Sequence, residues 1–207
     1  MKRYASVIVV GGILLALLVL AAFMLVRGRG DICPAGGLAL SPGGREFARL
    51  KNRVRPPGPQ DFDEKVTLEA LLRPGEDRGR WSESRAGRIE GYVVEVVEAG
   101  MEAANCFSAR DRDVHIHVAR RPDAPRTEWF VLEVTPRGGR WAVEWGWDWR
   151  ADTLKRELIG RRCRFEGWLL FDRGHADESE NTAPGARGNW RGTAWEIHPV
   201  TRIEVLE

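Results

Sequence analysis

The sequence predicts a mainly β protein, in which an N-terminal membrane helix is followed by a small five-stranded barrel with one short helix between strands three and four. Three observations support this prediction. Residues 4–26 are almost entirely apolar. From residue 87 onward, segments rich in β-branched and aromatic residues alternate with turn sequences, as strands do. Two segments, 111–118 and 193–200, alternate apolar and polar residues and so have one face for a core.

Residues 1–27 are expected to form a transmembrane anchor. The apolar run 4–26 would span ~35 Å as a helix, which is enough to cross a bilayer core of ~30 Å. A cleaved signal peptide is the alternative, but the run ends in bulky residues rather than in a small-x-small cleavage site. We therefore expect a single-pass protein of the cell membrane. Because long domains translocate largely regardless of flanking charge, we expect the soluble domain outside the cytoplasm.

Residues 28–60 are expected to be a basic tether rich in Gly and Pro, which disfavour regular structure. A short helix from Glu46 to Arg53 is compatible with the pattern. The basic residues of 45–55 would either lie against anionic lipid headgroups or belong to a solvated linker.

The folded domain is expected to cover residues 61–207. It would begin with a short helix over 64–73, capped by Thr67 and ended by Pro74 and Gly75. A second helix would run from Asp152 or Thr153 to Leu158. The strands are expected at 87–98, 112–119, 128–135, 161–172 and 190–197, with 200–205 continuing the last one.

Details of these strands indicate how the sheet is built. Gly91 would let the first strand bend around a small barrel. The third strand is largely apolar on both faces, so we expect it to be central. Pro199 cannot donate a hydrogen bond to a neighbouring strand and therefore marks an edge, a bulge or a change of direction.

Three strands, a helix and two more strands are the order of an OB-fold, a five-stranded Greek-key barrel, and residues 87–206 resemble that fold. The residues that carry the resemblance are GRIEGYVVEV, the helix ahead of LIGRRCRFEGWLLF, and the closing strand. The chain is also similar to bacterial membrane-anchored OB-like proteins that bear a WEIHP segment and have no established activity. OB-folds bind single-stranded nucleic acid or oligosaccharides, but a fold alone does not fix a function.

The charge distribution argues against nucleic acid as the partner. The whole chain has a formal net charge of +2, but residues 61–207 hold 23 basic and 28 acidic residues, a net charge of −5. Domains that bind a phosphate backbone are normally basic. We therefore expect an unknown ligand or a partner protein in place of nucleic acid.

The four histidines suggest a metal site. His115 and His117 share one face of a predicted strand, about 6.5–7 Å apart along it, and Asp113 lies on the same face. Glu196 and His198 share a face of the closing strand. We expect His115, His117 and His198 as candidate ligands of a divalent transition metal, with Glu196, Asp172 and His175 as further candidates. The alternative is that these residues are solvated or hydrogen-bonded within the domain.

A ligand surface is expected at the tryptophans, of which the chain has nine. Trp145, Trp147 and Trp149 would share one side if extended, and Trp190 precedes the closing strand. Aromatic rings of this kind stack on bases or sugars. The candidate ligand-binding residues are Trp145, Trp147, Trp190, Arg191 and Glu196. The alternative is that the indoles cover an open end of the barrel.

The three cysteines, Cys33, Cys106 and Cys163, cannot all pair within one chain. Cys106 and Cys163 would pair if the domain lies outside the cytoplasm, or Cys163 would be a small core residue.

These patterns predict a membrane-tethered binding module for an envelope-associated ligand or partner protein, and we do not expect an enzyme. The alternative is a metal-dependent phosphodiester hydrolase, in which the metal ion would activate water, Glu196 would act as general base, and Arg191 or Arg164 would steady an anion.

Overall fold

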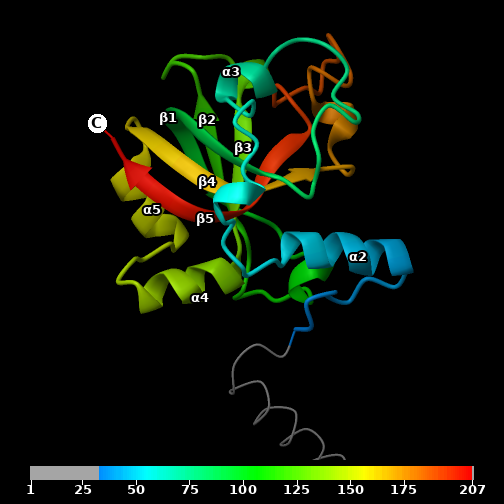
Figure 1. Cartoon of the computed structure of the whole chain (residues 1–207), viewed down its shortest axis with the longest axis vertical. Coiled ribbons are helices and arrows are strands. Elements are labelled where there is room, and N and C mark those ends of the chain that lie inside the picture. Colours follow the sequence, from blue (N-terminus) through cyan, green and yellow to red (C-terminus); the bar gives the residue numbers. More distant parts are fainter. Residues whose placement is uncertain (1–32, 207) are drawn as a thin grey trace, which may run out of the picture. The chain divides into compact units, whose positions relative to one another are not determined.

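The computed structural model describes residues 33–206 (Figure 1). No helix within these residues is long and apolar enough to span a lipid bilayer. The expected anchor, residues 1–27, lies outside the described part of the chain.

Five strands form a closed barrel in the order β1-β2-β3-β5-β4. This order is compatible with an OB-like fold. β1 pairs with β2 and β4, β2 with β3, and β4 with β5, all antiparallel, whereas β3 and β5 run parallel. The strands are β1 (Ala86–Glu98), β2 (Val114–Ala119), β3 (Phe130–Val134), β4 (Arg162–Phe171) and β5 (Trp195–Val205).

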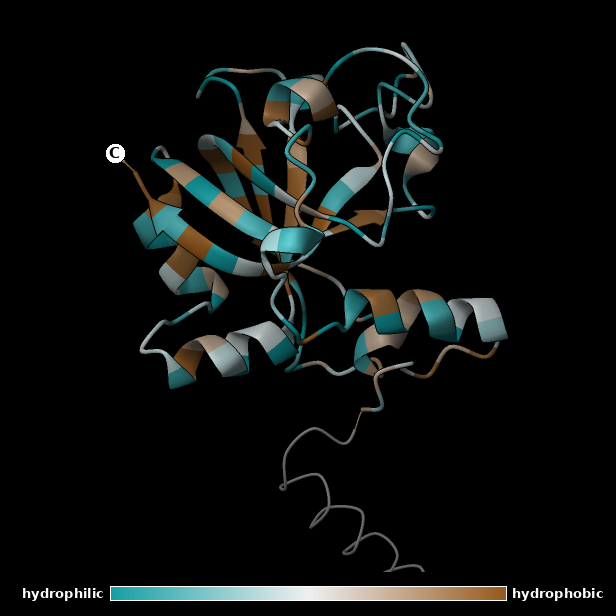
Figure 2. Cartoon of the chain, viewed as in Figure 1, coloured by the Kyte–Doolittle hydropathy of each residue, from teal (hydrophilic) through white to brown (hydrophobic). Residues whose placement is uncertain are grey.

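The barrel interior is filled by the apolar face of each strand, as the alternation predicts. Ile116, Leu132, Phe165, Leu169 and Ile197 are completely buried and belong to one core. Alternating bands of apolar and polar residues along β4 and β5 are visible in Figure 2. Because successive side chains of a strand point to opposite faces, this inward set directs the polar residues of β2 and β5 to the outside of the barrel.

Of the three alternatives at Pro199, an edge, a bulge or a change of direction, the structure shows a bulge. Opposite Gly167 and Leu169 of β4, β5 presents Val200 and Ile197, so β5 contains one residue more than β4 over this stretch. The extra residue lies around His198 and Pro199, and it bends the closing strand where it passes the site described below.

Helices cover the barrel outside the sheet. They are α2 (Pro42–Lys51), α3 (Leu68–Leu71), α4 (Pro136–Glu144) and α5 (Ala151–Leu158), and the short 3-10 turns are η1 (Pro59–Asp61), η2 (Ala103–Asn105), η3 (Arg126–Glu128) and η4 (Ala176–Glu178). The helices predicted before β1 and before β4 are present, and the Thr67 hydroxyl accepts a hydrogen bond from the Ala70 amide at 3.1 Å. The expected single helix between β3 and β4 is a pair, because α4 precedes α5.

The part of the expected tether after residue 34 belongs to the folded domain, which is one compact unit from residue 35 onward. Ser41 caps α2 by accepting a hydrogen bond from the Gly44 amide, and Pro42 occupies its first turn, which offsets the two glycines that follow. The Arg53 guanidinium donates to the carbonyl groups of Leu169 and His198. Of the basic residues of 45–55, Lys51 and Arg53 are therefore turned into the domain, whereas Arg49 and Arg55 are exposed.

Of the two alternatives for Cys163, a disulfide with Cys106 or a place in the core, the disulfide is wrong. Cys163 is a free, completely buried thiol in β4, which confirms the alternative of a core residue. Burial raises the pKa of this thiol to about 11, so it is protonated at neutral pH. Cys33 and Cys106 are both disulfide-bonded.

Candidate functional site

A polar cluster lies on the outer face of β2, β3 and β5 and consists of Asp113, His115, Glu133, Glu196 and His198. β3 lies between the other two strands in the barrel. His115 of β2 pairs with Glu133 of β3, and Glu196 of β5 pairs with Val131. Val131 is two residues before Glu133 in β3, so both residues point to the same face. The two polar faces expected from the sequence therefore meet, with Glu133 as the residue between them.

Glu133 is the centre of this cluster. Its Oε1 is 3.2 Å from Nε2 of His115, and its Oε2 is 3.0 Å from Nδ1 of His198. The second ring nitrogen of His198, Nε2, is 4.0 Å from Oδ2 of Asp113. Nδ1 of His198 is also 3.5 Å from Oε2 of Glu196. Two imidazoles and three carboxylates thus converge on one small region.

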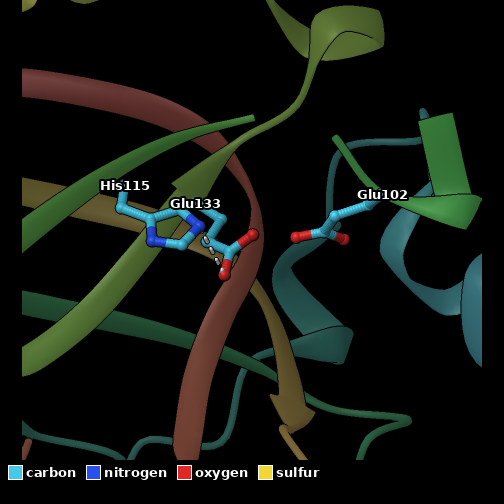
Figure 3. Close-up of side chains that lie close together, drawn as sticks. All are labelled: Glu102, His115 and Glu133. Carbon is cyan, nitrogen blue, oxygen red and sulfur yellow. Dashed lines mark ion pairs between the residues drawn. The ribbon is translucent and has the colours of Figure 1, made fainter. Parts of the chain in front are cut away.

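Segments outside the sheet close over the cluster. Asn105 of η2 donates a 2.9 Å hydrogen bond to Oδ1 of Asp113. Lys51, at the end of α2, pairs with Glu102 and lies 3.9 Å from Oδ2 of Asp113. Figure 3 shows Glu102 reaching toward His115 and Glu133 from the opposite side. As a result, Asp113, Glu133 and His198 are at most 3% exposed.

The charges in the cluster reinforce one another. Burial alone would raise the pKa of Glu133, but the positive charges of His115, His198 and Lys51 hold it well below its ordinary value. Burial alone would lower the pKa of both histidines, but Glu133 raises that of His115 to about 9 and that of His198 to about 10. Glu133 is therefore ionised at neutral pH and both imidazoles are charged.

Glu196 has a different environment. Its burial and the charges of Glu133 and Asp172 raise the pKa of Glu196 to about 7, against the opposing effect of Arg191. The Arg191 guanidinium is completely buried, 2.8 Å from Glu196 and 3.1 Å from Asp172. Its Nε donates to the Thr193 carbonyl at 2.8 Å. Arg191 and Glu196, expected on a ligand surface, are thus enclosed and hold the loop between β4 and β5 against the barrel.

His117 lies at the edge of this region and faces other partners. Its Nδ1 is 2.8 Å from Glu95, and its ring lies against Trp129 and Trp190, with centroids 5.5 and 5.6 Å away. Burial lowers the pKa of His117 to about 4, so this imidazole is neutral at pH 7. His175 also packs against Trp190, edge to face, and shares a 2.6 Å hydrogen bond with Asp172.

Two groups of three residues in the described part of the chain have the spacing to hold a metal ion. They are Glu102, His115 and Glu133, and Asp113, Glu133 and His198. Both contain Glu133, and neither contains His117. Of the three expected metal ligands, the structure therefore brings His115 and His198 to a common carboxylate and leaves His117 apart. The sequence analysis does not identify Glu133 as a site residue, because it lies in an otherwise apolar strand. A single carboxylate in such a strand is the signal that could have identified it.

The exposed tryptophans form a second site away from the polar cluster. Trp145 and Trp147 line a surface groove of about 690 Å³ in the connection between α4 and α5. Pro56 and Pro57 form part of its wall, and Glu166 and β5 residues 201–205 complete it. Figure 1 shows this connection and the loop that carries Trp190 at different ends of the barrel. Trp190 therefore does not share a surface with Trp145 and Trp147.

The sequence matches no protein-family model, and no curated protein matches it.

Proposed function

We propose that this protein is a membrane-tethered binding module whose OB-like barrel presents the groove at Trp145 and Trp147 to a saccharide chain of the cell envelope. The proposed location of the domain outside the cytoplasm is supported by the disulfide bonding of Cys106, because disulfides persist in oxidising compartments.

The observation that carries this proposal is the exposure of two neighbouring indoles. Trp145 is 54% and Trp147 is 49% exposed, whereas Trp149, Trp168 and Trp195 are almost completely buried. The ring of Trp141 lies against that of Trp145, with centroids 4.0 Å apart, and so supports it from behind. Exposed aromatic rings beside a groove offer flat apolar surfaces on which sugar rings or bases stack.

The polar residues of the groove favour a sugar over a nucleic acid. Glu166 pairs with Arg88 at 2.7 Å, and Glu204 pairs with Arg164 at 3.2 Å. Ion pairs of this kind offer hydrogen-bond donors and acceptors to hydroxyl groups without a net positive charge. The acidic balance of residues 61–207 opposes a phosphate backbone. The volume of the groove lies within the ~300–1,000 Å³ of small-molecule sites.

The test is a fluorescence titration of the purified full chain in detergent with soluble β-1,4-linked N-acetylglucosamine oligosaccharides of four to six units. We expect a saturable change of tryptophan emission, which Trp145→Ala combined with Trp147→Ala abolishes. Phe107→Ala is the matched control, because Phe107 is 55% exposed but does not line the groove. Equal binding by the double variant and the wild type would exclude the groove, and a lack of saturable binding to the wild type would exclude this class of ligand.

A metal-dependent phosphodiester hydrolase is the second candidate, and the buried, unpartnered polar atoms of the polar cluster favour it. Access opposes it, because a phosphodiester cannot reach Glu133 or His198, which are 3% and 0% exposed. Hydrolysis of bis(p-nitrophenyl) phosphate by the metal-loaded full chain, lost in Glu133→Gln, would support the hydrolase.

A further inference from the structure

Three side chains of the polar cluster, which have the spacing to bind a metal ion, come from three adjacent parts of the barrel. Asp113 immediately precedes β2, Glu133 lies in β3 and His198 lies in β5. One ligand atom from each of them lies within 4.8 Å of the other two. Glu133 is held by the pairing of β3 with β2. The Asp113 carbonyl accepts a hydrogen bond from the Ala99 amide, and the His198 carbonyl, at the bulge of β5, accepts one from Arg53.

Three buried polar atoms of this group lack a hydrogen bond to any described residue. Within residues 33–206, both ring nitrogens of His198 and Oε2 of Glu133 are buried and make none. The 3.0 Å separation of Nδ1 and Oε2 lacks hydrogen-bond geometry. Buried polar atoms are almost always satisfied, because an unsatisfied one costs about 1–3 kcal/mol. Nδ1 of His198 still faces the carboxylates of Glu133 and Glu196 at 3.0 and 3.5 Å, whereas Nε2 lies 4.0 Å from Asp113 and has no partner within hydrogen-bond distance in the described part of the chain. The buried, unpartnered Nε2 is therefore available to a ligand.

We propose that Asp113, Glu133 and His198 bind one divalent transition-metal ion, through Oδ2 of Asp113, a carboxylate oxygen of Glu133 and Nε2 of His198. One imidazole and two carboxylates are a ligand set typical of zinc and related ions. Because the three residues are almost completely buried, the site is structural. The ion would fasten the closing strand to β3 and to the start of β2.

Neighbouring side chains already orient these ligands. The Asn105 amide donates to Oδ1 of Asp113 and leaves Oδ2 for the ion. Glu196 lies 3.5 Å from Nδ1 of His198. A carboxylate in this position holds the proton on Nδ1 and so keeps Nε2 available for a metal, an arrangement found at many histidine ligands.

The positive charge of Lys51 would oppose the binding of a metal ion at this site. Its ammonium lies 3.9 Å from Oδ2 of Asp113 and also pairs with Glu102. A unit positive charge this close weakens the binding of a second cation. Removal of the ammonium by Lys51→Met should therefore strengthen metal binding, which an ion held elsewhere on the protein would not show.

The test is calorimetric titration of the full chain, free of affinity tags and treated with a chelator, with zinc ion alone. We expect one zinc ion per chain, bound about 100-fold or more weaker by His198→Gln and about tenfold tighter by Lys51→Met. His175→Gln and His117→Gln are matched controls and should leave the affinity unchanged, because neither side chain belongs to the group. Zinc well below one per chain, or equal affinity of wild type and His198→Gln, would overturn the proposal.

Cobalt(II) bound to the wild-type chain gives an independent readout if His198→Gln does not fold. X-ray absorption should show one imidazole and carboxylate oxygens around the ion, and the visible spectrum should differ from that of aqueous cobalt. An aqueous-type spectrum, or a coordination sphere without imidazole, would refute the site.

Discussion

Gly167 is the position at which a single added carbon atom should be most damaging. It lies in β4 opposite Val200 of β5, next to the irregular register. A Cβ atom at this position would lie 2.3 Å from the carbonyl oxygen of Pro199, 2.5 Å from Cγ2 of Ile197 and 3.0 Å from Cα of Val200. Two of these atoms belong to the backbone of β5, so Gly167→Ala can be accommodated only if the closing strand moves.

The cost of such a movement can be estimated. Overpacking of a well-packed region typically costs about 1–3 kcal/mol. Because the contact at 2.3 Å is with backbone, which cannot rotate away as a side chain can, we expect Gly167→Ala to lower the free energy of unfolding by about 3 kcal/mol. Gly43→Ala is the control, because no atom lies within 4 Å of the Cβ position in α2. It should be neutral or stabilising by up to about 1 kcal/mol.

The assay is urea unfolding of both variants and the wild type in the same detergent, followed by tryptophan fluorescence. A loss of less than about 0.5 kcal/mol for Gly167→Ala, within the range of ordinary surface substitutions, would refute the reasoning. It would mean that β5 is free to shift at the bulge next to His198.

Three further predictions concern single contacts. Thr67→Ala removes the cap of α3 and should lower the unfolding free energy by about 1 kcal/mol in the same urea assay; no change would mean that the cap is not needed. Arg191→Met leaves Asp172 and Glu196 without their shared cation and should cost about 3–5 kcal/mol, seen as a lower thermal midpoint; wild-type stability would contradict the role of this ion pair. The hydrogen bond to Asp172 raises the pKa of His175. Its stabilising effect is therefore complete below the unfolded-state pKa of about 6.5 and disappears as the pH rises through the raised value. The difference in urea midpoint between wild type and His175→Gln should be larger at pH 5.5 than at pH 9, and an equal difference at both would show that the pair is not ionic.

The strands and their faces could be predicted because strand periodicity is a local property of the sequence. Val114, Ile116 and Val118 alternate with two histidines, and the structure buries the first set in the core. The meeting of β2 and β5 around Glu133 could not be predicted in detail, because it depends on the parallel pairing of β3 with β5. No turn sequence encodes a pairing between strands so far apart in the chain.

The sequence does not predict α4 and places α2 too far along the chain. Both helices contain two glycines, which disfavour a helix, but both have a capped N-terminus. α4 begins Pro136-Arg137-Gly138-Gly139, and its two glycines disfavour a helix. The Thr135 hydroxyl nevertheless caps it by accepting a hydrogen bond from the Gly138 amide. α2 begins in the same way, and in both cases the cap followed by proline was the informative signal.

The main difference between the predicted and the observed site is that Arg191 and Glu196, expected on a ligand surface, are buried. Arg191 and Glu196 have side chains that commonly face solvent, and their sequence context gives no indication of a cover. Arg191 belongs to the loop between β4 and β5, and its ion pairs with Asp172, which follows β4, and with Glu196 of β5 hold this loop against the barrel. A charged residue is enclosed in this way only when its partners are enclosed with it, and partners distant in sequence cannot be identified from one chain alone.

The pairing of β5 with both β3 and β4 means that the barrel cannot close until the last strand has been synthesised. β1 to β4 are synthesised first and can associate while translation continues. Until Trp195–Val205 follows, β3 and β4 each keep an unpaired edge lined by apolar side chains such as Leu132 and Leu169. Unpaired strand edges recruit strands from other chains. A chain that ends before residue 195 therefore leaves both edges open to pairing with other chains.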